Sequence, residues 1–210
     1  MIDSSAGERL DALMAGSGRR ILGIAGLPGA GKSTLVAQLL AHAGAAAVGV
    51  PMDGFHLANA ELGRLGRAAR KGASDTFDAA GYVALLRRLR LPVPGETVYA
   101  PAFHREIEEP IAGEIAVPAD TRLVITEGNY LLLDEGPWKD VRGLLDEVWF
   151  VEVDDAQRHA QLLARHVRYG RTRQDALDWI ENTDEPNARR IALTAARADF
   201  QVRVTLDVPA

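Results

Sequence analysis

Short apolar runs alternate with longer amphipathic stretches along most of this chain of 210 residues. The apolar runs predict buried strands at residues 21–25, 46–50, 123–126 and 147–151, with a last one around 202–206. Helical periodicity is clearest at residues 33–42, 82–89 and 154–167. Strands that alternate with helices are typical of a parallel sheet covered on both faces. We therefore expect an α/β fold in three layers, with a mostly parallel five-stranded central sheet.

Two further strands are expected outside this alternation. Residues 98–103 and 114–117 predict short extra strands, separated by a polar turn region that contains Pro110 and Gly113. No linker-like stretch divides the chain, so we predict a single domain over residues 1–210. An arginine-rich helical insertion at about 165–184 is expected to be its lid and its most mobile part.

Composition narrows the class of protein. Hydrophobic residues make up 47%, charged residues 25% and aromatic residues 6% of the chain, which is ordinary for a globular domain. The absence of cysteine excludes disulfides, thiolate metal sites and a cysteine nucleophile, and makes the reducing cytoplasm the natural compartment. No apolar run is long enough to span a membrane. The net charge of -5 argues against a protein that coats nucleic acid or an anionic membrane.

A glycine-rich segment directly follows the first predicted strand. Its residues are Gly26, Leu27, Pro28, Gly29, Ala30, Gly31, Lys32, Ser33 and Thr34. They satisfy the phosphate-binding pattern of G, four residues, then G-K-[ST], between a strand and a helix. Glycines let backbone amides turn toward an anion, and the following helix directs its positive end to the same phosphates. Lys32 is expected to reach the β and γ phosphates and Ser33 to ligate Mg²⁺, so the segment predicts binding of ATP or GTP.

Other segments separate the classes of P-loop protein. A GTPase carries an Asn/Thr-Lys-x-Asp motif, but Lys71 precedes Gly-Ala and Lys139 precedes Asp-Val, so neither fits. Lys32 is the only other lysine of the chain. Motor and transporter ATPases are expected to end a run of four apolar residues in Asp-Glu, whereas residues 123–126 are followed by Glu127 and a glycine. These differences favour a small-molecule kinase.

Five segments together carry a family resemblance. They are residues 26–34, Met-Asp-Gly-Phe-His at 52–56, Arg-Lys-Gly at 70–72 with the stretch 75–78, Ala-Pro-Ala-Phe at 100–103 and Thr-Glu-Gly at 126–128. In order and spacing they resemble the family of uridine kinase, phosphoribulokinase and bacterial pantothenate kinase. Within it, the chain most resembles a branch named for nucleoside/nucleotide kinases or a fructose transport system kinase. The resemblance implies a P-loop kinase fold, ATP and Mg²⁺ as cofactors, and a small hydroxylated metabolite as acceptor.

Two acidic residues stand at ends of predicted strands, where parallel sheets bind their ligands. Asp53 lies just past the second strand, and phosphoryl transfer needs a carboxylate that orients or deprotonates the acceptor. The resemblance implies this role for Asp53, and a turn with a helix cap at Asp53 and Gly54 is the alternative. Glu127 ends the strand expected beside the P-loop, so Glu127, Ser33 and ATP oxygens predict a magnesium site. A simple Glu-Gly turn is the alternative there.

Several residues are candidates for binding the acceptor. They are His56, Arg70, Lys71, Phe103, His104 and Arg105. The resemblance implies an aromatic and a polar residue against the acceptor after the strand that ends near residue 102, and a closing loop at residues 70–71. Solvated loops are the alternative for His56 and for this loop. The residues after Phe103 depart from both the uridine and the pantothenate patterns, so neither specificity carries over.

Three arginines mark the predicted lid. Arg165 and Arg168 are one helical turn apart and face the same way, and Arg171 follows a glycine at the expected helix end. The resemblance implies a lid that folds over ATP and stabilises the transition-state charge. Cations at a helix end also suit the helix dipole without any function, which is the alternative.

We therefore expect an ATP- and Mg²⁺-dependent cytoplasmic kinase that transfers the γ-phosphoryl group to a hydroxyl of a small metabolite. Fructose-like sugars, uridine-like nucleosides, glycerate and pantothenate-like alcohols all remain compatible acceptors. The alternative is a nucleotide-dependent regulatory or binding ATPase without a small-molecule acceptor, and a nucleotide kinase is a third possibility. The sequence predicts no nucleic-acid or membrane partner and leaves the oligomeric state open.

Overall fold

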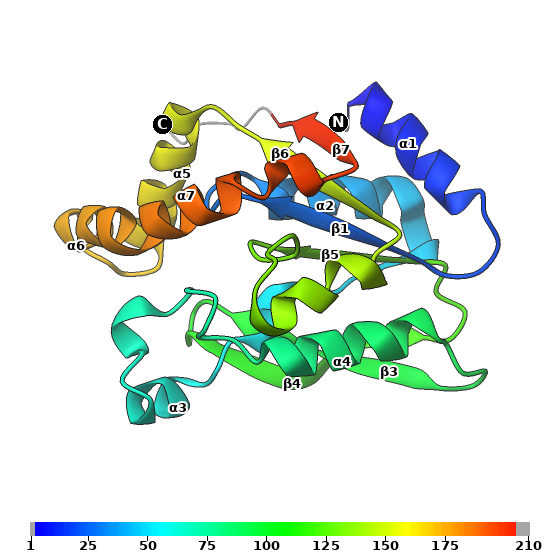
Figure 1. Cartoon of the computed structure of the whole chain (residues 1–210), viewed down its shortest axis with the longest axis horizontal. Helices are drawn as coiled ribbons and strands as arrows, with labels where there is room; N and C mark the ends of the chain where they lie inside the picture. Colours follow the sequence, from blue (N-terminus) through cyan, green and yellow to red (C-terminus); the bar gives the residue numbers. More distant parts are fainter. Residues whose placement is uncertain (1–2, 205–210) are drawn as a thin grey trace.

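The structure is a computed structural model and describes residues 3–204. Its centre is a sheet with the strand order β2-β5-β1-β6-β7 (Figure 1). The strands are β1 (Arg20–Gly26), β2 (Ala47–Gly49), β5 (Leu123–Gly128), β6 (Glu147–Glu152) and β7 (Phe200–Arg203). Every neighbouring pair in this sheet is parallel, which confirms the predicted central sheet within the described residues. The last predicted strand extended to residue 206, and its positions 205 and 206 lie outside the described residues.

Helices cover both faces of the sheet (Figure 1). They are α1 (Ser4–Met14), α2 (Lys32–Ala43), α3 (Asn59–Arg64), α4 (Ala79–Arg90), α5 (Asp155–Arg168), α6 (Arg173–Trp179) and α7 (Glu185–Ala192). The periodicity of the sequence predicted α2, α4 and α5, whereas it predicted none of α1, α3 and α7. None of the helices described here combines the length and the apolar character that crossing a membrane requires.

The core consists of two apolar layers, one on each face of the sheet. In β1, Ile21 and Ala25 belong to the layer that contains α4, while Leu22 and Ile24 belong to the layer that contains α1 and α2. All four side chains are fully buried. A strand buried on both faces reads as a continuous apolar run, which is why residues 21–25 predicted a central strand.

An antiparallel hairpin, β3 (Thr97–His104) and β4 (Glu109–Pro118), lies with α4 on one side of the central sheet (Figure 1). The prediction of a turn around Pro110 and Gly113 was wrong. The turn occupies residues 105–108, and both residues belong to β4. Most of β4 is exposed, and an exposed edge strand tolerates proline and glycine that a central strand would not.

The segment predicted as a lid is helical. Residues 165–184 include the end of α5, all of α6 and a π-helical turn, Ile180–Asp184, which continues into α7. The Asp154 carboxylate caps the start of α5 by accepting from the amides of Ala156 and Gln157. In Figure 1, α6 and α3 lie at the same end of the molecule, with α6 above α3 in this view. The mobility of this segment stays a prediction.

Candidate active site

The glycine-rich P-loop joins β1 to α2. Gly29 and Gly31 have φ angles of 79° and 84°, in the left-handed region that favours glycine. A Cβ atom at Gly29 would lie 2.7 Å from Cγ of Leu162, so the loop packs closely against α5, the helix that leads into the lid. Backbone amides of this kind of loop and the N-terminus of the next helix together form an anion-binding cradle.

The ammonium group of Lys32 lies within this loop. Its Nζ atom donates to the carbonyl oxygens of Gly26 (3.0 Å) and Leu27 (2.9 Å) and to Oδ1 of Asn129 (2.7 Å). Burial lowers the pKa of Lys32 to about 8, although nearby carboxylates oppose the shift. Because an ammonium has three protons, a phosphate that binds Lys32 must replace at least one of these three acceptors.

Ser33 and Glu127 bring two oxygen ligands together beside the P-loop. The Ser33 hydroxyl donates to Oε2 of Glu127 at 3.0 Å, because β5 is the direct neighbour of β1. Burial and Asp53 raise the pKa of Glu127, and Lys32 opposes them. Residues 3–204 contain no cluster of three metal-ligating side chains. Mg²⁺ in nucleotide sites needs no such cluster, because phosphate oxygens and water complete its octahedron.

Asp53 lies just beyond β2, in the 3₁₀ turn η2 (Met52–Phe55). Its Oδ2 atom accepts a hydrogen bond from Nη2 of Arg105 at 3.0 Å. Burial alone would raise the pKa of Asp53, but His56, Arg105 and Lys32 outweigh burial and lower the pKa below its usual value. The group is therefore a carboxylate at neutral pH, and it is a weak proton acceptor.

The turn that contains Asp53 packs directly on the hairpin. A Cβ atom at Gly54 would lie 2.2 Å from the carbonyl oxygen of Pro101, so only glycine permits this approach. Gly54 is therefore required by the turn, which agrees with the alternative interpretation of Asp53 and Gly54 as a turn. The Asp53 side chain caps no helix and instead binds Arg105, which follows β3.

Three aromatic rings line up beside Asp53. The imidazole ring of His56 lies with its centroid 4.0 Å from that of Phe77 and 4.5 Å from that of Phe103. A bridge between His56 and Phe77 joins their backbones in antiparallel fashion. Nδ1 of His56 lies 2.8 Å from the carbonyl oxygen of Asp53. Burial lowers the pKa of His56, although the Asp53 carboxylate opposes the shift.

Lys71 lies over the ring of Phe103. Its Nζ atom lies 5.2 Å from the ring centroid and donates to Oδ1 of Asn59 (2.6 Å) and to the carbonyl oxygen of Glu108. The carboxylate of Glu108 lies 3.9 Å away. Burial lowers the pKa of Lys71, against the effect of Glu108.

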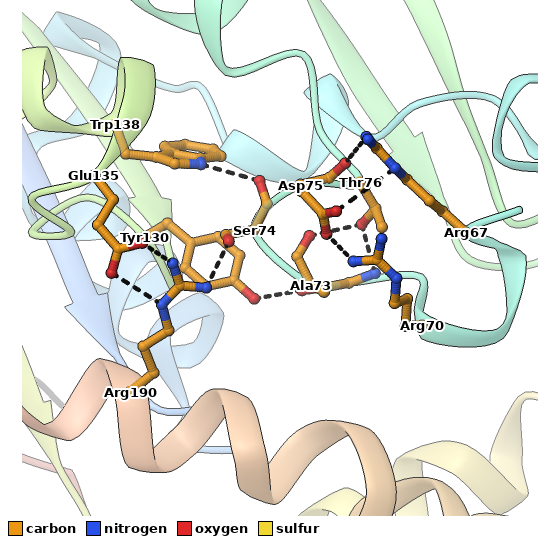
Figure 2. A network of polar contacts seen from close by, with 11 residues as sticks. Arg67, Arg70, Ala73, Ser74, Asp75, Thr76, Tyr130, Glu135, Trp138 and Arg190 are labelled. Carbon is orange, nitrogen blue, oxygen red and sulfur yellow. Dashed lines mark hydrogen bonds and ion pairs between the residues drawn. The ribbon is translucent and has the colours of Figure 1, made fainter. Parts of the chain in front are cut away.

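A polar network holds the loop that carries Lys71, residues 70–76, from two directions (Figure 2). Tyr130 donates through its hydroxyl to the carbonyl oxygen of Gly72 at 2.5 Å, and Trp138 donates to that of Ser74 at 3.0 Å. From α7, Arg190 donates to Oγ of Ser74 at 2.9 Å. Figure 2 also shows Arg190 bound to Glu135, and Arg67 and Arg70 converging on Asp75. The loop is therefore tied both to the segment after β5 and to the helix after the lid.

The three arginines of the predicted lid occupy different environments. Arg165 belongs to the last turns of α5, where burial and Arg105 lower its pKa against Asp184 and Asp53. The Arg171 guanidinium lies 3.8 Å from the ring centroid of Trp179 in α6. The Arg168 guanidinium lies over the Tyr169 ring, with its Cζ atom 5.8 Å from the ring centroid. All three line the same cavity as the P-loop.

This cavity has a volume of about 1210 Å³ and brings most of the predicted site residues together. Its lining includes residues 28–34 of the P-loop and Asp53, His56, Lys71, Phe103, Arg105, Glu127, Arg165, Arg168 and Arg171. Arg70 and His104 are absent from the lining. Arg70 pairs with Asp75 on the outside of its loop, and His104 pairs with Glu114 across the hairpin at 2.6 Å. These two side chains make local ion pairs outside the cavity lining, and their contact with an acceptor stays a prediction.

A model of the Phosphoribulokinase / Uridine kinase family matches residues 21–208, which is most of the chain. The chain belongs to this family. It is 36% identical over 181 residues to "Putative uridine kinase C227.14" of Schizosaccharomyces pombe, with 80% of this chain and 76% of that one covered. It is 33% identical to the uncharacterized protein YggC of Escherichia coli, with 89% and 78% covered.

Two solved structures share the fold of this chain. The crystal structure of a "putative fructose transport system kinase" from Silicibacter sp. TM1040 superposes with a TM-score of 0.84 at 35% identity, covering 96% of this chain and all of that one. The structure of YFH7 from Saccharomyces cerevisiae, described as "a putative P-loop containing kinase with a circular permutation", gives a TM-score of 0.78 at 19% identity, with 97% and 98% covered. The predicted P-loop kinase fold and the predicted family are thus confirmed, as is the general activity of a nucleotide-dependent kinase.

Several residues of the candidate site were not predicted from the sequence. Asn129 accepts a hydrogen bond from Lys32. Asn59 and Glu108 accept hydrogen bonds from Lys71, and Trp179 stacks on the guanidinium of Arg171. Asn129 had a sequence signal, because it comes two positions after Glu127 at the same sheet edge. The others depend on contacts between distant segments, which no local spacing reveals.

The network in Figure 2 leads to a first prediction. Replacing Arg190 with methionine removes its bonds to Ser74 and Glu135, so we expect faster amide hydrogen exchange in residues 70–76. Loss of the part-buried, charge-assisted hydrogen bond to Ser74 is also expected to lower the Tm by a few degrees, since ~1 kcal/mol shifts a domain of this size by about 2–4 °C. Exposed Arg189 provides the control, because Arg189→Met should leave the exchange of this loop unchanged. Equal exchange in both variants would show that Arg190 does not hold the loop.

Proposed function

We propose that this chain is a kinase that transfers the γ-phosphoryl group of ATP to a hydroxyl group of a small metabolite. The observation that carries the proposal is the position of Asp53, a carboxylate that lines the same cavity as Lys32 and the Ser33–Glu127 pair. A nucleotide-binding cradle with a carboxylate facing it has the parts that phosphoryl transfer to an alcohol requires. A regulatory ATPase has no need of this second, acceptor side.

In the proposed mechanism, the acceptor oxygen attacks the γ-phosphorus atom while the bond to the β-γ bridging oxygen breaks, and ADP leaves with that electron pair. Asp53 accepts a hydrogen bond from the acceptor hydroxyl and then its proton. Because the pKa of Asp53 is lowered, its main contribution is to orient the hydroxyl, and the proton moves late, as a loose transition state allows.

The remaining residues act on the phosphates. Lys32 is proposed to hold the β and γ phosphates, and Arg165, Arg168 and Arg171 to neutralise the charge of the transferred group from the lid side. Ser33 and Glu127 would hold Mg²⁺, which would neutralise part of the phosphate charge. The low pKa of His56 leaves a neutral ring beside the reacting carboxylate.

A screen for phosphate transfer tests this proposal. The purified chain is incubated with γ-labelled ATP, Mg²⁺ and a library of sugars, polyols, nucleosides and hydroxy acids, and label in the organic product is measured together with ADP. We expect at least one compound to become labelled with ADP formed in equal amount. ATP hydrolysis that no hydroxyl compound changes, but that a protein partner does, would replace the kinase with a regulatory ATPase.

The pKa of Lys32 gives a pH prediction for the free enzyme. Lys32 is cationic below about pH 8 and neutral above it, and only the cation attracts phosphate. We therefore expect kcat/KM for MgATP to fall above pH 8 with a slope of one proton, since this ratio reports groups of the free enzyme. In Lys32→Arg, any activity that remains should lack this alkaline limb, because arginine stays protonated. An identical limb in that variant would assign the titration to another group.

A further inference from the structure

The acceptor side of the cavity is unusually rich in fixed positive charge. Lys71 and Arg105 both lie over the ring of Phe103, with Nζ and Cζ at 5.2 Å and 5.9 Å from its centroid. Both residues line the cavity, as does Arg165 from α5. Arg105 uses one nitrogen to bind Asp53, and its planar fork retains further donors. The cavity that Asp53 lines thus receives cations from three separate elements, although the Glu108 carboxylate also belongs to its lining.

The Lys71 side chain is largely buried, and several contacts hold its ammonium group in place. Only 11% of its side chain is exposed, although lysines are rarely buried without a strong partner. Its hydrogen-bond acceptors are two neutral oxygens, from Asn59 and the Glu108 backbone. Within residues 3–204, the one carboxylate that comes within 4 Å is on Glu108, whose side chain is 54% exposed, and Glu109 acts from farther away. The cost of burying this ammonium is therefore only partly offset in the described residues.

The polar network that holds residues 70–76 also fixes the position of Lys71. Lys71 directly precedes Gly72, whose carbonyl oxygen accepts from Tyr130 and whose amide donates to Oγ1 of Thr76 at 2.9 Å. Tyr130 lies two residues beyond the end of β5, and Thr76 is fully buried. The cation is thus anchored to the same strand that carries Glu127. A site that fixes a cation in this way is preorganised for an anion.

The aromatic rings on the Asp53 side of the pocket are engaged by one another and by cations. Phe103 contacts His56 and lies beneath Lys71 and Arg105, while Phe77 is buried against His56, Tyr130 and Trp138. The aromatic surface is therefore already used by ring contacts and cations. These contacts favour a polar, charged acceptor over a flat heterocycle.

His56 adds a hydrogen-bond acceptor beside the reacting hydroxyl. A carbonyl oxygen can only accept, so Nδ1 of His56 carries the proton in its 2.8 Å bond to Asp53. In the neutral ring Nε2 then has a free lone pair, which suits a second hydroxyl group of the acceptor. The lowered pKa of His56 is consistent with this neutral ring.

From this arrangement we infer that the acceptor is a small polyhydroxylated metabolite that carries an anionic group, a phosphate monoester or a carboxylate. The anion binds between Lys71 and Arg105, a neighbouring hydroxyl donates to His56, and the hydroxyl to be phosphorylated lies at Asp53. This inference rests on the proposed function and specifies its acceptor.

Matched pairs of acceptors test the inference. Each pair shares a carbon skeleton and differs in the anion: glycerol with glycerate and glycerol 3-phosphate, fructose with its 6-phosphate, ribose with its 5-phosphate, pantothenol with pantothenate, and uridine with its 5′-monophosphate. We expect the best anionic compound to exceed its neutral partner in kcat/KM by about 10- to 100-fold, as charge-assisted hydrogen bonds allow. The carboxylate and phosphate arms then identify which anion is recognised.

Substitutions of Lys71 connect this preference to the proposed site. Lys71→Met should lower kcat/KM for the anionic compound about 10- to 100-fold, mostly through KM, and lower that of its neutral partner much less. Lys71→Arg should retain most of the preference, and Lys139→Met, which removes an exposed charge outside the cavity, should retain all of it. The Tm of each variant and its KM for MgATP separate an effect on the acceptor from misfolding.

Three results would overturn the inference. Neutral compounds that are phosphorylated as well as their anionic partners would leave the kinase intact but remove the anionic acceptor. Equal losses for both members of a pair in Lys71→Met would show that Lys71 acts on folding or on ATP. Absence of phosphate transfer to every compound in both arms would overturn the proposed kinase function together with the inference.

Discussion

Replacing Asp53 with asparagine is expected to lower kcat with the true acceptor by about 10²- to 10⁴-fold, the usual contribution of a general base. Asparagine keeps the size of the side chain and can still accept a hydrogen bond, so the hydroxyl loses a charged partner without a change of shape. The KM for MgATP should change little, because the P-loop and Lys32 remain intact. Steady-state kinetics with acceptor and ATP varied separately measure both effects.

The same substitution has a second measurable consequence. Asp53 binds Arg105 at 3.0 Å, so its neutralisation releases a cation into the pocket. If the acceptor is anionic, its binding in Asp53→Asn should be as tight as in the parent chain or tighter, although turnover falls. The exposed residue Asp120 provides a control of the same chemistry, and Asp120→Asn should behave as the parent chain does. Unchanged turnover in Asp53→Asn would remove Asp53 from the mechanism.

Replacing Lys32 with methionine is expected to reduce kcat/KM for MgATP by three orders of magnitude or so, since one preorganised charge on the transferring group contributes about 10²- to 10³-fold to kcat and its loss also weakens binding. Unlike Asp53→Asn, this variant should lose ATP affinity in a direct binding measurement without acceptor. Isothermal titration with a non-hydrolysable ATP analogue and Mg²⁺ separates the two variants.

Lys139→Met is the matched control for Lys32→Met, because it removes the same charge from an exposed position outside the cavity. The part-buried hydrogen bonds of Lys32 also contribute to the stability of the fold. Its removal leaves the carbonyl oxygens of Gly26 and Leu27 and Oδ1 of Asn129 without this donor, so a modest fall in Tm is expected beside the loss of binding. ATP affinity that is retained in Lys32→Met would contradict the proposed role of this residue.

The nucleotide half of the site was largely readable from the sequence. The apolar run 21–25, the glycine-rich turn and the helix at 33–42 are consecutive, so their geometry follows from local rules. Glu127 could be placed because a residue at the end of a neighbouring parallel strand must lie at the same sheet edge. Its hydrogen bond with Ser33 agrees with that expectation.

The acceptor half was less readable, for physical reasons. Its residues come from η2, the loop 70–76 and the hairpin turn, where no hydrophobic period fixes the direction of a side chain. The single turn at 105–108 directs Arg105 toward Asp53, while the preceding residue, His104, pairs across the hairpin with Glu114. Adjacent residues with the same predicted role therefore point to different surroundings. The same holds for Arg70 and Lys71.

The division of the site between two sheets has an evolutionary consequence. The P-loop and Glu127, which are proposed to bind ATP and Mg²⁺, belong to the parallel sheet and the start of α2, whereas Phe103 and Arg105 belong to a separate antiparallel hairpin. The hairpin reaches the reaction centre mainly through Gly54 packed on Pro101 and through Arg105 bound to Asp53. Substitutions in the outer hairpin and in residues 70–76 can therefore exchange one acceptor for another without disturbing nucleotide binding, which would allow one scaffold to diversify across many metabolites.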